Sequence, residues 1–280
     1  MLIDTYFDYQ IKYENIYGQN TVVLMEVGSF YELYGIDNNI EKIVNLKKIT
    51  EILNIQLTRR NKNILENNRE NCLMAGFPSI SLNRYLKILV NSNYTVILIE
   101  QTTDPPNPKR EITKIISPGT DIEFLDSDSN CILSIFIEQE ESINRKIFSL
   151  GISTIDLSTG ISKVMSIYIN DYNINSLFEE IFRINEKFNP KELIISTNNT
   201  VDLTKKIILE NLMNNNIIYH LNINNLNKEY FNINFQNKFL TKFFEINSIL
   251  SSIEYLDLEK NVSSIISLII LLDFVEQHNE

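Results

Sequence analysis

The 280-residue sequence contains no tryptophan, only two cysteines and two histidines, and few glycines and prolines (seven and six). Cys72 and Cys131 do not form a paired motif, which argues against a disulfide framework or a cysteine-rich zinc site. We therefore expect an intracellular, reducing compartment, and cytoplasm, nucleus, viral factory and mitochondrion all fit. His220 and His278 are isolated in the sequence. These absences predict no metal site and no catalytic residues.

Long hydrophobic runs are also missing. The longest, Ile265 to Val275, contains Asp273 and is shorter than the roughly 20 residues that span a bilayer. We interpret it as a buried helix and expect no membrane contact. Asp4 and Asp8 interrupt the first residues, which is not the pattern of a signal peptide. Apolar residues make up 44% of the chain, which favours a folded protein over a disordered one.

Positive charge is scarce overall, since the net charge is −11, and this alone argues against binding nucleic acid. The deficit is uneven, however. Residues 1–120 contain 13 basic and 13 acidic residues, whereas residues 121–280 contain 12 basic and 23 acidic ones. The basic residues of the first part form three clusters that could neutralise phosphates, although each could also be a solvated surface. The clusters are Lys47-Lys48, Arg59-Arg60 with Lys62, and Lys109-Arg110 with Lys114.

The stretch from Val22 to Gly35 combines a strand pattern with an unusual pair of side chains. An apolar run from Val22 to Val27 predicts a buried strand, Gly28-Ser29 breaks it, and a second short strand follows. Alternation places Phe30, Glu32 and Tyr34 on one face and Tyr31 and Leu33 on the other. If Tyr31 and Leu33 fill the core, an aromatic ring and a carboxylate stand side by side outside it. The alternative is that Phe30 belongs to the core and Glu32 is a solvated edge charge.

Periodicity predicts a mixed α/β domain over residues 1–120. Helices are expected at 2–17, at 38–53 and after Ser81, which could cap the third one. Strands are expected at 22–27, 30–34, 55–60, 94–100 and 112–117, with a loop at 104–108. The acidic, turn-rich residues after Thr120 predict a linker over 121–128.

Residues 129–280 predict a second α/β domain with a ribonuclease-H-like order of elements, in which strands come first and then alternate with helices. The expected strands are 131–137, 147–156, 161–169, 192–196 and 217–221, with Ser158-Thr159-Gly160 as a hairpin turn. The expected helices are 173–188, 201–213, 236–254 and 259–277.

Several segments together resemble one family. Gly28-Ser29-Phe30-Tyr31-Glu32-Leu33 is similar to the Gly-Asp-Phe-Tyr-Glu-Leu segment of MutS, the DNA mismatch-recognition family. Further matches follow in the family's order: Leu57-Thr58-Arg59-Arg60, Met74-Ala75-Gly76-Phe77-Pro78, Tyr85-Leu86, Glu100-Gln101, Asp104-Pro105, Lys114 to Thr120, and Leu157-Ser158-Thr159-Gly160 after Asp156. The Val-Gly-Ser-Phe-Tyr-Glu wording resembles the branch found in giant viruses and coral mitochondria.

The resemblance implies that residues 1–120 are a mismatch-binding domain and residues 129–280 a connector domain. It implies that Phe30 wedges beside a mispaired base and that Glu32 hydrogen-bonds that base. An aromatic wedge unstacks and kinks the duplex, which costs less at a weakly held mispair. The resemblance also implies contacts with the DNA backbone, which set register without reading sequence. The residues expected to make them are Gly28, Ser29, Arg59, Arg60, Arg110 and Lys114.

Two substitutions and one missing motif depart from the family pattern. Ser29 stands where the family usually has Asp, and Ile80 where many members have His, so backbone contacts at these two positions are in doubt. No Gly-x-x-x-x-Gly-Lys-Ser/Thr segment occurs, so these residues do not cradle a nucleoside triphosphate. We expect no cofactor here and no enzyme activity. ATP and Mg²⁺ are implied only for the family's C-terminal ATPase domain, and a second MutS-like subunit or those further domains are the expected protein partners.

Two other functions remain as alternatives. A ribonuclease-H-like domain with Asp156 in a strand could be a metal nuclease, which needs several carboxylates converging on Mg²⁺. The carboxylates available, Glu179, Glu180, Asp202 and Glu210, show no metal-loop spacing. The acidic second half would also fit a protein-interaction module that does not read DNA.

Overall fold

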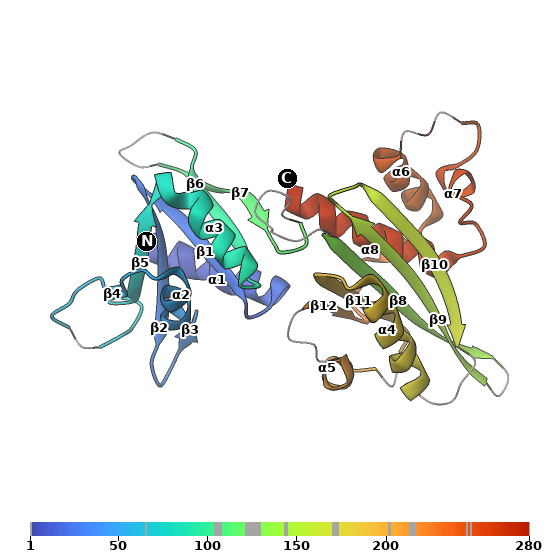
Figure 1. The fold of residues 1–280 in the computed structure, drawn as a ribbon, viewed down its shortest axis with the longest axis horizontal. Coiled ribbons are helices and arrows are strands. Elements are labelled where there is room, and N and C mark those ends of the chain that lie inside the picture. Colours follow the sequence, from blue (N-terminus) through green and yellow to red (C-terminus); the bar gives the residue numbers. More distant parts are fainter. Residues whose placement is uncertain are drawn as a thin grey trace. The chain divides into compact units, whose positions relative to one another are not determined.

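The computed structural model describes residues 2–64, 66–103, 108–120, 130–142, 145–169, 174–200, 203–212, 217–244, 246 and 248–279. Contacts divide the chain into two compact units, Met1–Asp126 with Gln277–Glu280, and Ser127–Glu276. Both units are mixed α/β, as the sequence predicts (Figure 1). The predicted linker 121–128 and most of the predicted loop 104–108 lie outside the described residues.

The first unit is built on a seven-stranded sheet with the order β4-β5-β2-β1-β6-β7, and β3 pairs with β2 off this path. The central strands β1 and β6 pair parallel, and the pairs on either side of them are antiparallel. The strands are β1 (Thr21–Val27), β2 (Phe30–Asp37), β3 (Lys42–Ile43), β4 (Thr58–Arg59), β5 (Leu73–Pro78), β6 (Thr95–Gln101) and β7 (Arg110–Ile116). The helices are α1 (Leu2–Tyr17), α2 (Leu46–Leu53), the 3-10 turn η1 (Ser79–Ser81) and α3 (Leu82–Asn91).

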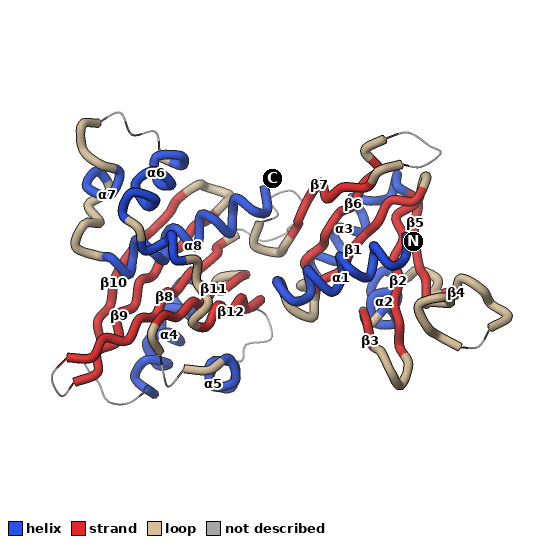
Figure 2. Tube along the Cα trace, turned by 180° about the vertical axis from the view of Figure 1, so that it is seen from behind, coloured by secondary structure: helices blue, strands red, loops and turns tan. Residues whose placement is uncertain are grey.

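Helices cover both faces of this sheet (Figure 2). On one face α2 and α3 pack over a core that includes Tyr31 and Leu33 of β2. On the other face α1 crosses β1 and β2, where the hydroxyl of buried Tyr6 donates to the carbonyl of Val23 at 3.0 Å. The ring of Tyr6 also meets that of Tyr34 edge-on, with 5.0 Å between centroids. The alternation predicted for β2 therefore sets which of its side chains faces which helix layer.

Three local predictions in this unit are wrong. The predicted helix 38–53 begins only at Leu46. Residues 42–43 form the strand β3 instead, and Val44 has a φ of +59°, which interrupts a helix. The Asn45 side chain then caps α2 by accepting from the backbone N–H of Lys48. The predicted strand 55–60 is reduced to Thr58–Arg59. Ser81 precedes α3 but makes no capping hydrogen bond through its side chain.

The second unit is built on a five-stranded sheet with the order β10-β9-β8-β11-β12. Strands β8, β9 and β10 form an antiparallel meander, and β11 and β12 continue the sheet parallel to β8. The strands are β8 (Cys131–Ser142), β9 (Arg145–Asp156), β10 (Ile161–Ile169), β11 (Glu192–Asn198) and β12 (Ile218–Ile223). The mixed α/β class is confirmed, while the ribonuclease-H-like comparison stays a prediction.

Helices also cover both faces of the second sheet. Helices α4 (Ile174–Phe188) and α5 (Lys205–Leu212) pack on the face formed by Leu133, Ile135 and their neighbours, and α8 (Val262–Asn279) packs on the opposite face. The predicted helix 236–254 is wrong as one element. It is instead two helices, α6 (Ile233–Phe243) and the short α7 (Ser252–Tyr255), preceded by the 3-10 turn η2 (Lys228–Phe231).

Candidate nucleic-acid interface

The hairpin between β1 and β2 presents Phe30 at its tip. Val27 pairs with Phe30 across a two-residue turn in which Gly28 has a φ of +63°, a conformation that suits glycine at the first position of such a turn. Phe30 is 46% exposed, whereas Tyr31 and Leu33 are buried. The alternative that Phe30 belongs to the core is therefore wrong, and the ring stands at the surface of the sheet.

Glu32 lies next to Phe30 on the same face of β2 and is partly buried. Its carboxylate accepts a hydrogen bond from the Tyr34 hydroxyl. Burial raises the pKa of Tyr34, and the hydrogen bond to Glu32 raises it further, so the phenol stays protonated and acts as the donor. Across the sheet Gly76 pairs with Glu32 and has no side chain to cover it. The face is thus covered by α1 at Tyr34 but accessible at Phe30 and Glu32.

Basic residues join Glu32 on this face. An open hollow of about 650 Å³ is formed by residues of α1, β2, β4 and β5 and by the residues that follow β4. It is lined by Leu2, Ile3, Glu32, Tyr34, Thr58, Arg59, Arg60, Lys62 and Met74. Arg60 and Lys62 are exposed, and Arg59 donates from Nη1 to the carbonyl of Ile64 at 3.3 Å. The structure therefore brings Glu32 together with the Arg59-Arg60-Lys62 cluster.

Arg110 and Lys114, both predicted to contact the DNA backbone, lie on the edge strand β7. Arg110 is partly buried, and its guanidinium donates from Nε to the carbonyl of Glu26 at 2.9 Å. It also donates to the Pro108 carbonyl at 3.4 Å and to Oε1 of Gln101 at 3.5 Å. Lys114 is exposed and pairs with Leu98, which lies on the face covered by α2 and α3. By register Lys114 thus belongs to the opposite face from Phe30.

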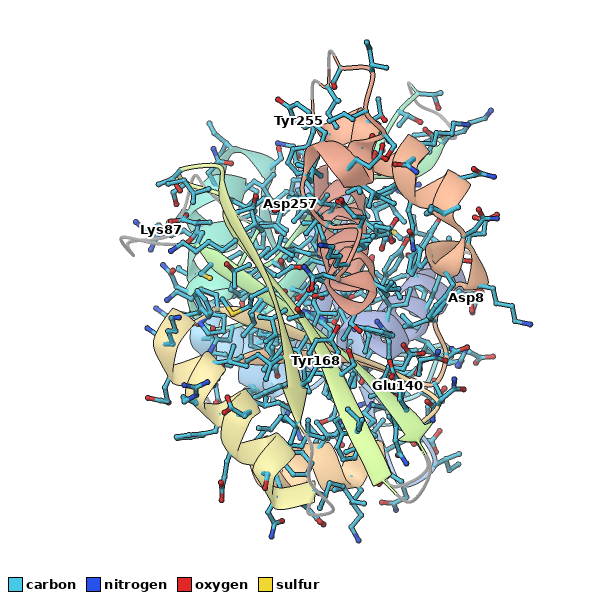
Figure 3. All side chains as sticks on the ribbon, turned by 90° about the vertical axis from the view of Figure 1, so that its right-hand side faces the viewer. Asp8, Lys87, Glu140, Tyr168, Tyr255 and Asp257 are labelled. Atoms are coloured by element: carbon cyan, nitrogen blue, oxygen red, sulfur yellow. The ribbon has the colours of Figure 1, made fainter. Side chains whose placement is uncertain are left out.

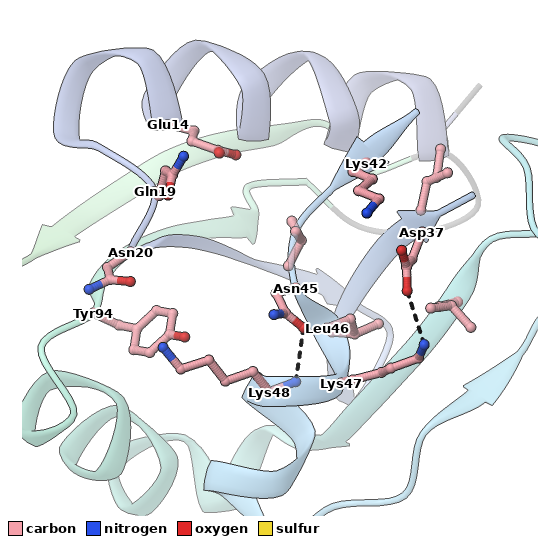
Figure 4. A pocket seen from close by; sticks show the side chains of 13 residues that line it. Glu14, Gln19, Asn20, Asp37, Lys42, Asn45, Leu46, Lys47, Lys48 and Tyr94 are labelled. Carbon is pink, nitrogen blue, oxygen red and sulfur yellow. Dashed lines mark hydrogen bonds and ion pairs between the residues drawn. The ribbon is translucent and has the colours of Figure 1, made fainter. Parts of the chain in front are cut away.

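The Lys47-Lys48 cluster lies at the other end of β2 (Figure 4). The Lys47 ammonium is 2.9 Å from Asp37, the last residue of β2, and the Lys48 ammonium lies 5.7 Å from the centroid of the Tyr94 ring. Five residues of strand, roughly 17 Å, separate Asp37 from Glu32. This basic pair therefore does not adjoin the Phe30 hairpin.

The carboxylates weighed for a metal nuclease do not meet in the described part of the chain. No group of three or more His, Cys, Asp or Glu side chains is placed there to hold a metal ion. Asp202 lies outside the described residues. His220 faces the fully buried Glu192 of β11, with 2.7 Å between Nε2 and Oε2, so it has a structural partner within the core.

Across the described ranges, no helix is long and apolar enough to cross a membrane.

On the second unit, Tyr168 of β10 and Tyr255 of α7 are more than half exposed, at 53% and 54% (Figure 3). Single exposed aromatics of this kind are ordinary on protein surfaces and do not by themselves define an interaction site.

Sequence reasoning missed three residues near the hairpin. Ile80 was noted only as a departure, yet it is 94% exposed two residues beyond Pro78, which pairs with Phe30. Gln101 contacts both Glu26 and the Gly28 carbonyl of the turn, although 75 positions separate Gln101 from Glu26 in sequence. Two signals were available: Glu26 is a charged residue at the end of an apolar strand, and Gln101 belongs to the Glu100-Gln101 family match.

Comparisons with known proteins bear on the family to which this chain belongs. Residues 9–124 match the family model MutS domain I. A DNA mismatch repair protein mutS homolog of Acanthamoeba polyphaga mimivirus is 31% identical, with 98% of this chain and 26% of that protein covered. The MutS proteins of Borreliella burgdorferi and Staphylococcus haemolyticus are 29% and 30% identical over 83% and 68% of this chain.

The chain spans about a quarter of the length of these relatives, or less. Among solved structures, a simian T-cell lymphotropic virus intasome in complex with a PP2A regulatory subunit matches 50% of this chain at 13% identity and a TM-score of 0.24, which carries no argument. The mimivirus relative agrees with the giant-virus part of the resemblance. Together with the ordered motifs from Gly28 to Thr120, these matches show that the chain belongs to the MutS family of DNA mismatch repair proteins and contains its domain I.

Proposed function

We propose that this chain binds duplex DNA at mispairs, with Phe30 as the wedge and Glu32 as the contact to the mispaired base. The observation that carries the proposal is the placement of Phe30, which is 46% exposed at the tip of a tight hairpin beside the carboxylate of Glu32. An exposed ring on a rigid strand end can enter a base step, and inserting it kinks the duplex at a cost of a few kcal/mol.

Recognition in this proposal is a difference in deformation energy. A matched step resists unstacking, whereas a mispaired step is already weakly stacked and paired, so the same kink costs less there. Arg60 and Lys62 stand on the same face as Glu32 and supply positive charge for the phosphates that flank the kink. The proposed binding to mispairs is supported by the relatives, which are named as DNA mismatch repair proteins.

The proposal is tested by fluorescence anisotropy with a G·T duplex and its G·C counterpart at one fixed salt concentration. Tighter binding of the G·T duplex is expected. Equal affinity for the two duplexes, or no binding of either at low salt, would contradict the proposal.

Reversing the charge of Arg60 is expected to weaken binding to matched and mismatched duplexes about equally, because phosphate contacts carry no sequence information. The slope of log affinity against log salt should also become less steep by roughly one counterion. The control is Lys42→Glu, which changes the net charge by the same amount. Lys42 lies on β3 opposite Asp37, which is roughly 17 Å along β2 from Glu32. That separation exceeds the Debye length of about 10 Å in 0.1 M salt. A loss confined to the mismatched duplex would show that Arg60 is not a phosphate contact.

We further propose that these 280 residues neither hydrolyse ATP nor cut DNA by themselves. Their seven glycines include no phosphate-binding loop pattern, so the residues present do not fit a nucleoside triphosphate. ATP and Mg²⁺ would act in the ATPase domain expected elsewhere in a full-length relative, and a second MutS-like subunit is the proposed protein partner. The measurement is phosphate release and strand scission with Mg²⁺ present. Turnover that disappeared with Asp156→Asn would favour the nuclease alternative.

A further inference from the structure

We propose that Arg110 and Gln101 are positioning residues that hold the Phe30 hairpin in place, and that Arg110 acts through the hairpin and not through a phosphate. The inference rests on the proposed function, because it assigns these residues to the same wedge.

The hairpin extends beyond the end of its parallel ladder. The pairing of β1 with β6 ends at Met25 opposite Ile99, so the next residues of β1 have no ladder partner on that side. Side chains continue the pairing where the backbone ladder stops. The backbone N–H of Gln101 donates to the Glu26 carboxylate at 2.8 Å, and Nε2 of its side chain donates to the Gly28 carbonyl at 3.2 Å.

Arg110 supplies the next contact from the neighbouring strand. Its Nε donates to the Glu26 carbonyl at 2.9 Å, while Nη1 and Nη2 reach the Pro108 carbonyl and Gln101 Oε1. On the other side of the turn, the Ser79 amide donates to the Ser29 carbonyl at 2.9 Å. The hairpin carrying Phe30 is therefore held at the carbonyls of Glu26, Gly28 and Ser29, from β6 and β7 on one side and from the residue after β5 on the other.

A wedge needs such support because unstacking a base step pushes back on the ring. Discrimination requires that the ring imposes the same kink on a matched and on a mismatched step, since the cost of that kink then differs between them. If the turn moves instead of the duplex, the kink is not imposed and the difference in deformation energy is lost. A guanidinium donating to a backbone carbonyl is a charge-assisted hydrogen bond and resists this displacement more than a neutral one. Arg110 of β7 and Gln101 of β6 are paired across the two strands, and Arg110 donates to the Gln101 side chain, so each residue restrains the other.

The test separates this role from phosphate binding through two variants of Arg110. Arg110→Met removes the charge and all donors, whereas Arg110→Lys keeps the charge but cannot reach the same three acceptors with a planar fork. We expect both to lower the ratio of G·T to G·C affinity about tenfold, the effect of one charge-assisted hydrogen bond. Binding of the matched duplex and the salt slope should stay near those of the unmodified chain. The control is Lys109→Met, which removes an exposed charge from the adjoining position.

A double-mutant cycle assigns the effect to the wedge. In a Phe30→Ala background, Arg110→Met should change the ratio no further, because there is no ring left to position. Equal weakening of both duplexes with a flatter salt slope, or an Arg110→Lys variant that behaves like the unmodified chain, would overturn the inference and restore Arg110 as a phosphate contact. If Phe30→Ala alone keeps the preference for G·T, the proposed function fails, whatever the Arg110 variants do.

Hydrogen exchange in the DNA-free chain provides a measurement that does not depend on binding. Amides from Val27 to Tyr31 should exchange several-fold faster in Arg110→Met and in Gln101→Leu than in the unmodified chain, because each variant removes one of the side chains that hold the turn. Lys109→Met should leave that exchange unchanged. Unchanged exchange in Arg110→Met would overturn the inference even if DNA discrimination fell.

Discussion

Replacing Phe30 with alanine is expected to abolish the preference for mismatched over matched duplex while leaving weak, salt-sensitive binding. Stacking of an aromatic side chain on a base contributes roughly 1–3 kcal/mol, which corresponds to a loss of roughly 5- to 150-fold in affinity for the mismatched duplex. Without the ring, nothing offsets the cost of the kink, so both duplexes are bound only through their backbones. The measurement is fluorescence anisotropy on paired G·T and G·C duplexes at fixed salt.

A matched control is available on the second unit. Phe182 of α4 is 57% exposed, close to the 46% of Phe30, so Phe182→Ala removes the same side chain from a comparably exposed site. It should leave both affinities unchanged. A Phe30→Ala variant that still preferred G·T would show that the ring is not the wedge, although the structure places it at the surface.

Glu32 is expected to give a different result, which separates the base contact from the wedge. A carboxylate brought against the DNA polyanion is repelled, and Gln removes that charge while keeping a hydrogen-bonding group of the same size. Glu32→Gln should therefore keep or increase affinity for both duplexes while reducing discrimination, and Glu32→Ala should lose the base contact. Both variants also alter the acceptor that Tyr34 uses, so unfolding curves accompany the binding curves.

Much of β2 could be predicted from the sequence because its pattern is local. Period-two alternation placed Tyr31 and Leu33 on the face opposite Phe30 but left open which face is the core, and burial shows that Tyr31 and Leu33 are the buried pair. Alternation alone did not show that Tyr34, on the same face as Phe30, would be buried. That depends on α1, which packs on this face through Tyr6, whose ring meets that of Tyr34 edge-on. The burial of Tyr34 is therefore set by a contact with another element and not by the strand pattern.

The hydrogen-bond partners of Arg110 could not be predicted for a different reason. Its position in a basic cluster predicts a phosphate contact, but its partner is the Glu26 carbonyl, 84 positions away in sequence. Such a contact follows from the parallel pairing of β1 with β6 and the antiparallel pairing of β6 with β7. A charge pattern identifies which side chains could bind phosphate, and only the register shows which of them are already held by protein acceptors.

The predicted start of α2 was wrong because periodicity takes no account of helix capping. Ile40 and Ile43 fit a helical repeat with Ile49, yet Ile40 is 97% exposed and Ile43 pairs in β3. Asn45 offers its side chain to the Lys48 amide, which favours starting the helix there. The correct start was readable from the cap, since an Asn before an apolar turn is a stronger signal than an extended repeat.

In the second unit, Gly151→Ala is expected to be strongly destabilising, because α8 lies directly against β9 at this residue. A Cβ built on Gly151 would lie 1.8 Å from the Ser263 carbonyl oxygen and 2.7 Å from the Ser264 nitrogen, and these are backbone atoms. The helix cannot move away freely, because Ser149 Oγ is 2.5 Å from Ser263 Oγ and Ser267 donates to the Ser134 carbonyl at 2.9 Å. We expect a loss at or above the upper end of overpacking, about 3 kcal/mol.

Ser153→Ala is the matched control, since it places the same methyl group two residues along the same strand on the same face. Ser153 already has a Cβ, and its hydroxyl is buried without a hydrogen-bond partner among the described residues, so its loss should be neutral or slightly stabilising. Urea unfolding followed by circular dichroism measures both changes, and hydrogen exchange of residues 148–154 and 262–268 locates them. If Gly151→Ala unfolded at the same urea concentration as Ser153→Ala, α8 would have room to move away from β9. The small residues beneath it would then not be needed for its close packing on the sheet.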